Sequence, residues 1–350
     1  MPYVTVTICL PDAQRSDQCT TVDHMQLDTG SVGIRVLASA LGPALAARLP
    51  SQTGATDDPT GSAPLAECAV FGSGYTWGTI RRADVTIGGK SAGNLPLQVI
   101  ADGRYPAPSD CRSRGVTDLG TAADMGANGV LGIGPATRDY PAAAQAVLAA
   151  GYYYCGSAGS CSNTRVPLDT QVANPVANFT SDNNGTIIRL PSVPPEGSLS
   201  VTGTLVFGIG TQQNNTLPPN LNILALDPYG YFPTTYKGTR YTSAIDSGSN
   251  ANLFYDATVP YSGWWYMPVT TLSLSAILSG VDRTATPVTV PFTLANGWTL
   301  RSNGNVAYDS LGSPSAGMFV WGLPFFFGRS VYTAIGNVPA GKQQGAFIAF

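Results

Sequence analysis

The chain has 350 residues, of which only 11% are charged, and its formal net charge is −3. This balance excludes a basic surface for nucleic acid or for an anionic membrane, and no apolar run approaches the roughly 18 residues of a membrane helix, so we expect no membrane span. With 40 glycines and 27 prolines, the composition is typical of a loop-rich β-protein, long enough for one large domain or two lobes.

The six cysteines predict disulfides and therefore an oxidising compartment. We expect a secreted, periplasmic or cell-surface protein. Because the first ten residues lack a charged segment and a cleavage pattern, we interpret the chain as a mature or trimmed form whose export signal lies outside it. The chain has no CxxC and one histidine, so we expect no zinc and no cofactor. Closeness favours three pairs, although other connectivities stay open: Cys9 with Cys19, Cys155 with Cys161, and Cys68 with Cys111.

The first part of the chain predicts a β-hairpin followed by a short helix. Residues 3–10 and 19–27 alternate as strands do, with a polar turn between them. His24 lies in the second strand, and we interpret it as structural because no GxSxG turn supplies the nucleophile of a Ser-His-Asp triad. Residues 39–49, SALGPALAARL, are the most helix-like segment.

The middle of the chain predicts a second hairpin and a glycine-rich strand. Residues 67–90 have a Gly-rich, aromatic-bearing tip, which fits either a mobile cover over a cleft or an ordinary surface turn. Residues 127–135, ANGVLGIGP, are not a phosphate loop, because no lysine follows and the GxGxxG order is absent. Residues 141–150 are an Ala-rich helix candidate.

The last part of the chain returns to a β pattern. The aromatic run at 325–327 is interpreted as core. The expected strands lie within residues 200–210, 222–227, 241–254, 288–294, 298–300, 318–336 and 345–350.

Two distant stretches share one motif. Residues 25–33 read MQLDTGSVG and residues 244–251 read AIDSGSNA, so Asp28 and Asp246 each follow an apolar residue and precede a hydroxyl residue, Gly and Ser. Two unrelated Asx turns are the alternative interpretation. If the turns meet, their carboxyls share one proton because both cannot stay ionised. One is then a base for a water and the other an acid for a substrate carbonyl, which is general acid–base hydrolysis.

Together these segments resemble the pepsin-like aspartic peptidases from about Val4 to Phe350. In that family each D-[ST]-G turn is paired with a later strand that ends in two apolar residues and Gly, as in VLG ending at Gly132 and VWG ending at Gly322. The IDSGSN and WGLPFFFGR segments are similar to those of exported pepsin-like proteins of bacteria. The resemblance implies an all-β, bilobal pepsin-like (acid protease) fold, with the active cleft between two β-barrel-like lobes at residues 1–195 and 196–350.

The resemblance also implies the site residues. Asp28 and Asp246 match the catalytic pair, whose shared proton is the known behaviour of aspartic proteases. The hydroxyls directly after each Asp are expected to bond across the lobes, and the serines after each Gly to steady the carboxylates. These supporting residues are Thr29, Gly30 and Ser31 in the first motif and Ser247, Gly248 and Ser249 in the second.

The segment FGSGYTWG lines up with the family's flap, which implies that Phe71, Gly72, Gly74 and Tyr75 cover the substrate. Two positions depart from the family: Phe71 replaces the flap tyrosine, and Arg35 replaces the tryptophan that hydrogen-bonds to it. We expect Arg35 to stack on Phe71, a contact worth about 0.5–2 kcal/mol, and its charge to hold the dyad more ionised. Tyr75 is an alternative source of the flap hydroxyl.

The leading hypothesis is a monomeric aspartic endopeptidase that acts on a peptide or protein substrate. Because the flap is altered, the alternative hypothesis of a pepsin-fold binding or inhibitor protein without turnover stays open. A carbohydrate hydrolase is weaker, because glycosidases hold their carboxyls about 5 Å or more apart and these turns resemble a contact pair.

Overall fold

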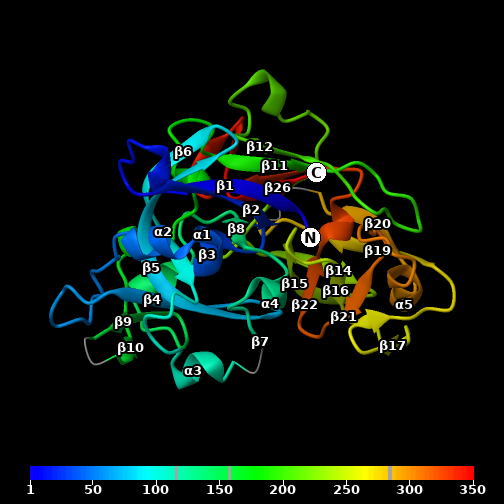
Figure 1. The fold of residues 1–350 in the computed structure, drawn as a ribbon. Coiled ribbons are helices and arrows are strands. Elements are labelled where there is room, and N and C mark those ends of the chain that lie inside the picture. The colour runs from blue at the N-terminus through cyan, green and yellow to red at the C-terminus, as the bar shows by residue number, and fades with distance from the viewer. Residues whose placement is uncertain (115–116, 157–158, 283–285) are drawn as a thin grey trace.

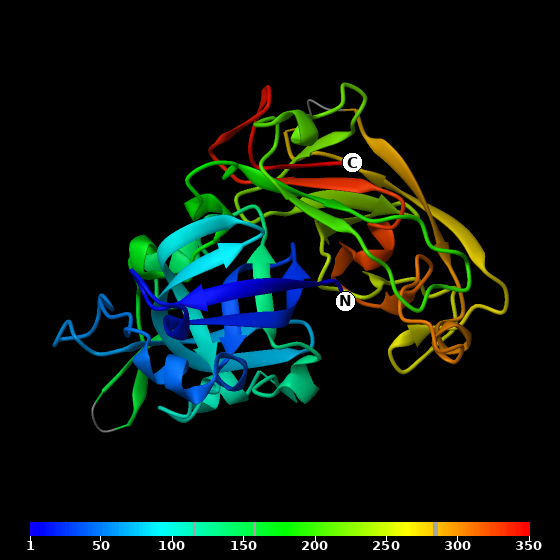
Figure 2. The same ribbon diagram turned by 45° about the horizontal axis from the view of Figure 1, so that its top comes forward.

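The computed structural model describes residues 1–114, 117–156, 159–282 and 286–350. The described residues are mostly β, with barrel-like sheets in two lobes (Figure 1). The expectation of a two-lobed β-protein is confirmed at this level. The turned view in Figure 2 shows the blue and cyan first lobe beside the yellow and orange part of the second lobe.

The first lobe is a ten-stranded sheet that closes on itself, because β1 pairs with β5 as well as with β2. The predicted first hairpin is confirmed, with Cys9 opposite Cys19 in the register. The strands in spatial order are β1 (Tyr3–Cys9), β2 (Cys19–Asp28), β8 (Gly129–Ile133), β3 (Val32–Leu37), β6 (Lys90–Ile100), β5 (Gly74–Ile87), β4 (Leu65–Val70), β9 (Tyr152–Cys155) and β10 (Cys161–Asn163), and β7 (Thr117–Asp118) pairs with β5.

The second lobe has a seven-stranded sheet and a small separate hairpin, β17 (Tyr261–Ser262) with β18 (Trp265–Tyr266). The seven strands in spatial order are β20 (Val288–Leu294), β19 (Leu272–Leu278), β14 (Phe232–Tyr236), β15 (Thr239–Ile245), β22 (Met318–Trp321), β16 (Asn252–Phe254) and β21 (Gly312–Pro314).

A five-stranded sheet lies across the top of the molecule in Figure 1. The predicted C-terminal strand is confirmed as β26, which pairs with β23 and β13. The strands in spatial order are β12 (Thr204–Phe207), β11 (Gly185–Arg189), β23 (Ser330–Ala334), β26 (Phe347–Ala349) and β13 (Ile223–Ala225), and β24 (Pro339–Ala340) pairs with β25 (Gln343–Gln344) beside it.

The two lobes repeat one arrangement of three strands around each motif. In the first lobe β2 is parallel to β8, and β3 is antiparallel to β8. In the second lobe β15 is parallel to β22, and β16 is antiparallel to β22. Asp28 ends β2 and Asp246 directly follows β15, so the same local topology positions both carboxylates.

The segment expected to be helical at 39–49 is helical but interrupted. It forms α1 (Ala38–Leu41) and α2 (Pro43–Arg48) because Gly42 has φ 79° and a proline follows. Two other expectations about helices and strands are wrong. The helix expected at 141–150 is a single 3₁₀ turn, η2 (Pro141–Ala144). The strand expected at 298–300 is instead α5 (Gly297–Arg301), because the Asn296 side chain accepts hydrogen bonds from two backbone N–H groups of its first turn.

The remaining helical elements are single turns. They are η1 (Ser16–Gln18), α3 (Ser109–Arg112), α4 (Ala122–Met125), η3 (Leu168–Thr170), η4 (Val176–Asn178), η5 (Gln213–Asn215) and η6 (Leu323–Phe325).

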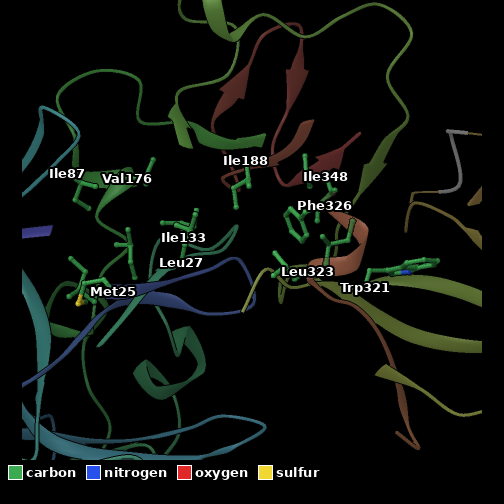
Figure 3. Packing of buried hydrophobic residues seen from close by; sticks show 14 of the residues in the cluster. Met25, Leu27, Ile87, Ile133, Val176, Ile188, Trp321, Leu323, Phe326 and Ile348 are labelled. Atoms are coloured by element: carbon green, nitrogen blue, oxygen red, sulfur yellow. The ribbon is translucent and has the colours of Figure 1, made fainter. Parts of the chain in front are cut away.

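One apolar cluster runs through both lobes. Figure 3 shows Leu27 and Ile133 on the first-lobe side and Leu323 and Phe326 on the second-lobe side. The aromatic run at 325–327 is buried, which confirms the core interpretation. The lobes therefore share a core beneath the two Asp motifs.

Three disulfides have the predicted pairing: Cys9–Cys19, Cys68–Cys111 and Cys155–Cys161. They indicate an extracellular or periplasmic protein, because such bonds persist in oxidising compartments. Within the described residues, every helix is too short or too polar to cross a membrane.

Candidate active site

The two motifs meet through reciprocal hydrogen bonds across the lobes. The Thr29 hydroxyl donates to the Ile245 carbonyl at 3.0 Å and accepts from the Ser247 N–H at 2.9 Å. The Ser247 hydroxyl donates to the Leu27 carbonyl at 2.8 Å and accepts from the Thr29 N–H at 3.1 Å. All four bonds are buried, so neither motif can shift without leaving polar groups unpaired.

Each carboxylate has the same two partners in its own motif. Asp28 accepts from the Gly30 N–H at 2.8 Å and from the Ser31 hydroxyl at 2.5 Å. Asp246 accepts from the Gly248 N–H at 2.7 Å and from the Ser249 hydroxyl at 2.7 Å. These bonds fix the orientation of both carboxylates before any ligand binds.

Glycine is required where each motif approaches the other carboxylate. A Cβ on Gly30 would lie 2.7 Å from Asp246 Cγ, and a Cβ on Gly248 would lie 2.7 Å from Asp28 Oδ1. Real Cβ atoms are essentially never found so close to another heavy atom. The backbone of each turn therefore lies directly against the acid of the opposite turn.

The strands behind the motifs also need glycine. A Cβ on Gly132 would lie 2.6 Å from the Val32 nitrogen, and one on Gly322 would lie 2.1 Å from the Ala251 oxygen. Gly132 within β8 and Gly322 directly after β22 thus let the motif loops pass close to these strands.

The pKa of Asp28 is raised well above the usual value of an aspartate. Burial is the largest cause, followed by the negative charge of Asp246 and a hydrogen bond with that carboxyl. The Ser31 hydroxyl and the Gly30 N–H oppose the shift. Asp28 therefore stays protonated to higher pH than an exposed aspartate would.

Two cavities, of about 430 and 490 Å³, meet at the dyad. Asp28, Asp246, Phe71 and Gly72 border both cavities, so the tip of the β4–β5 hairpin covers the carboxylates. The first cavity is also lined by Arg35, Asp139, Tyr140, Tyr229 and Tyr231, and the second by Leu119, Val130, Leu253, Trp264 and Trp265.

Two of the predicted flap residues lie outside the lining of both cavities. Gly74 pairs with Thr117 of β7, and a Cβ there would lie 2.2 Å from the Thr117 oxygen. Tyr75 is 5% exposed and belongs to the apolar cluster that contains Cys68. Burial, together with the negative charge of Asp118, raises the pKa of Tyr75. The Tyr75 hydroxyl is therefore not placed to contact a ligand at the dyad.

Arg35 is buried in an ion-pair cluster at the base of the flap. Its Nη2 lies 2.5 Å from Glu67 Oε1 and 2.8 Å from Asp139 Oδ2, and its Nη1 donates to the Val32 carbonyl at 2.8 Å. Burial and the charge of Glu67 raise the pKa of Asp139 well above its usual value. Two acids therefore face one guanidinium, and the raised pKa favours the protonated form of Asp139.

The expected contact between Arg35 and Phe71 is present, with the guanidinium carbon 5.8 Å from the ring centroid. The expected effect on the dyad does not follow, because Glu67 and Asp139 balance the charge of Arg35. The pKa of Asp28 is raised and not lowered.

Several residues in and around the site were missed by sequence reasoning. Glu67, the buried partner of Arg35, carried a signal, since glutamate occurs only twice in the chain and this one lies in β4, which leads into the flap. Asp139, Tyr229 and Trp264 lie in irregular segments between strands, where residue spacing indicates no common surface.

The remaining titratable candidates lie apart from the dyad. His24 is exposed and pairs with Asp23 at 3.0 Å, with its ring beside Tyr3. A search of residues 1–114, 117–156, 159–282 and 286–350 found no group of three or more His, Cys, Asp or Glu side chains arranged to hold a metal ion.

Comparison with known proteins gives a family without an assigned activity. None of the curated proteins matches the sequence. A family described as "Protein of unknown function (DUF3443)" matches residues 1–350. The chain therefore belongs to the DUF3443 family.

Proposed function

We propose that this protein is an aspartic endopeptidase that hydrolyses peptide bonds with a water activated by Asp28 and Asp246. The observation that carries the proposal is the mirrored pair of hydrogen-bonded carboxylates where the two cavities meet. The repeated three-strand arrangement supports a pepsin-like fold. The reaction needs no cofactor, and we expect the protein to act as a monomer.

In the proposed reaction Asp28 supplies the shared proton and Asp246 is the base. Asp246 takes a proton from the water as its oxygen bonds to the substrate carbonyl carbon, while Asp28 gives its proton to the carbonyl oxygen. The tetrahedral diol then collapses: the C–N bond breaks, the amine nitrogen takes a proton from Asp246, and a hydroxyl proton returns to Asp28. Atoms and charge balance without a covalent intermediate.

The cavities support an extended peptide as substrate. Both are bordered by the two carboxylates and by the flap tip, so a chain running from one to the other passes the carboxylates. Polar and apolar groups line both cavities, which suits a backbone with alternating side chains.

The test is cleavage of denatured casein between about pH 3 and pH 6, with and without pepstatin. We expect cleavage by the wild type and at least a 1,000-fold loss in Asp28→Asn and in Asp246→Asn, roughly the scale on which one general acid–base group contributes. Asp169→Asn is the matched control, because Asp169 is exposed and lies outside the lining of both cavities. Equal cleavage by Asp28→Asn and the wild type would refute the dyad mechanism.

A second candidate is a peptide-binding protein without turnover. It is favoured by one observation: the flap residue over the dyad is Phe71, and the Tyr75 hydroxyl lies outside the cavities. Peptide binding without cleavage at any pH would select this candidate.

A further inference from the structure

The second lobe has an exposed tryptophan at the tip of a hairpin. Trp264 follows Gly263, whose φ of 57° makes the tight turn between β17 and β18. Trp264 is 76% exposed, more than any of the other four tryptophans. Figure 1 shows the hairpin at the margin of the second lobe.

The base of this hairpin is held firmly. Trp265 lies under the Arg301 guanidinium, 4.9 Å from the ring centroid, and a Cβ on Gly297 would lie 2.7 Å from the Trp265 Cβ. Tyr266 is fully buried, and its hydroxyl donates to the Phe254 carbonyl at 2.7 Å. The exposed position of Trp264 is therefore set by a packed support.

Trp264 borders the same cavity as the dyad. The cavity of about 490 Å³ is lined by Phe71 and Gly72 of the flap and by Trp264 of the second hairpin. Its other apolar lining comes from both lobes: Leu119, Met125, Val130, Leu253 and Trp265. Single exposed apolar residues are normal on a surface, but this one completes the wall of an apolar recess.

We propose that Trp264 is a specificity-determining residue and that the hairpin Tyr261–Tyr266 is a second cover over the cleft. This inference rests on the proposed peptide-cleaving site and names what that site selects: an extended peptide with a large apolar side chain in the second cavity. The indole ring packs on that side chain and removes it from water. Tryptophan contributes most to an interface when it buries apolar surface in this way.

Trp298 provides a matched control. It is also a tryptophan of the second lobe and is 50% exposed, but it lies on α5 outside the lining of both cavities. A general effect of removing an exposed indole would be equal in the two variants. An effect through the cleft would appear only at Trp264.

The experiment measures binding without turnover. Asp28→Asn protein is immobilised and exposed to a decapeptide library in which each position is Leu, Phe, Ser or Asp, and retained peptides are identified by mass spectrometry. We expect enrichment of Leu or Phe at one position, lost by about tenfold or more in the Trp264→Ala variant, partly kept in Trp264→Phe, and unchanged in Trp298→Ala. Unfolding midpoints of the three variants check that each is folded.

The outcomes separate this inference from the proposed function. Trp264-dependent retention with no cleavage by the wild type would support the inference and refute the peptidase. Cleavage with the same apolar preference in Trp264→Ala and Trp298→Ala would refute the inference and leave the peptidase standing. Absence of any retained peptide would overturn the inference.

Discussion

Replacing Arg35 by Met should destabilise the protein strongly at neutral pH and much less in acid. The change leaves the Glu67 and Asp139 carboxyls buried, at 0% and 4% side-chain exposure, without their cation. At the observed separations and an effective dielectric constant of about 20, the attraction lost by an ionised carboxylate is about 6 kcal/mol. Relief of the guanidinium's own burial offsets part of this, so we expect a net cost of about 3–5 kcal/mol near pH 7.

The pH dependence follows from the raised pKa of Asp139. The folded protein holds a proton there that the unfolded chain has already released, so this contribution to stability is present below the usual aspartate pKa. It is lost as pH rises through the raised pKa, at up to about 1.4 kcal/mol per pH unit for one proton. In Arg35→Met, stability should fall more steeply with rising pH than in the wild type. In Glu67→Gln it should fall less steeply, because the remaining acid and guanidinium form a one-to-one pair.

The assay is urea unfolding of both variants and the wild type at several pH values between about 4 and 7. Arg15→Met is the control, because its pair with Asp17 is exposed and should not change stability measurably. Parallel stability curves for Arg35→Met and Glu67→Gln would refute the reasoning. So would a larger cost for Glu67→Gln than for Arg35→Met.

Two further predictions concern stability. Removing the Cys68–Cys111 bridge, which spans 43 residues, should lower the free energy of unfolding by about 4 kcal/mol. Removing the Cys155–Cys161 bridge, which spans 6 residues, should lower it by about 2 kcal/mol. Equal urea midpoints of the two double-alanine variants would contradict this loop-entropy argument. Gly322→Ala should lose more than about 2 kcal/mol because its Cβ would meet the Ala251 oxygen, whereas Gly72→Ala has nothing within 4 Å and should melt like the wild type.

The sequence was sufficient to predict the structure where a local pattern of residues is compatible with one arrangement. Two D-[ST]-G-S turns predicted that Asp28 and Asp246 meet, and the structure brings them together. Alternation predicted β1 and β2, and closeness along the chain predicted the disulfides.

The sequence was insufficient to predict the structure where a single residue ends a helix or where a side chain's partner comes from a distant segment. Gly42 with its following proline interrupts a helix that the apolar pattern alone would continue. Asn296 caps a short helix in a segment with a strand-like composition. Arg35 was correctly placed near Phe71, but its neutralisation by Glu67 and Asp139 depends on three segments that pack together only in the folded chain.

The sheet across the top of the molecule makes the two halves of the polypeptide interdependent. A chain cut after residue 195 would keep β11 but lose β12 and β23, the neighbours on both of its edges. The same cut would strip the apolar cluster beneath the motifs of the side chains that the second half supplies. Neither fragment would keep a complete sheet and core, so separately expressed halves should bring the two acids together only by reassociating.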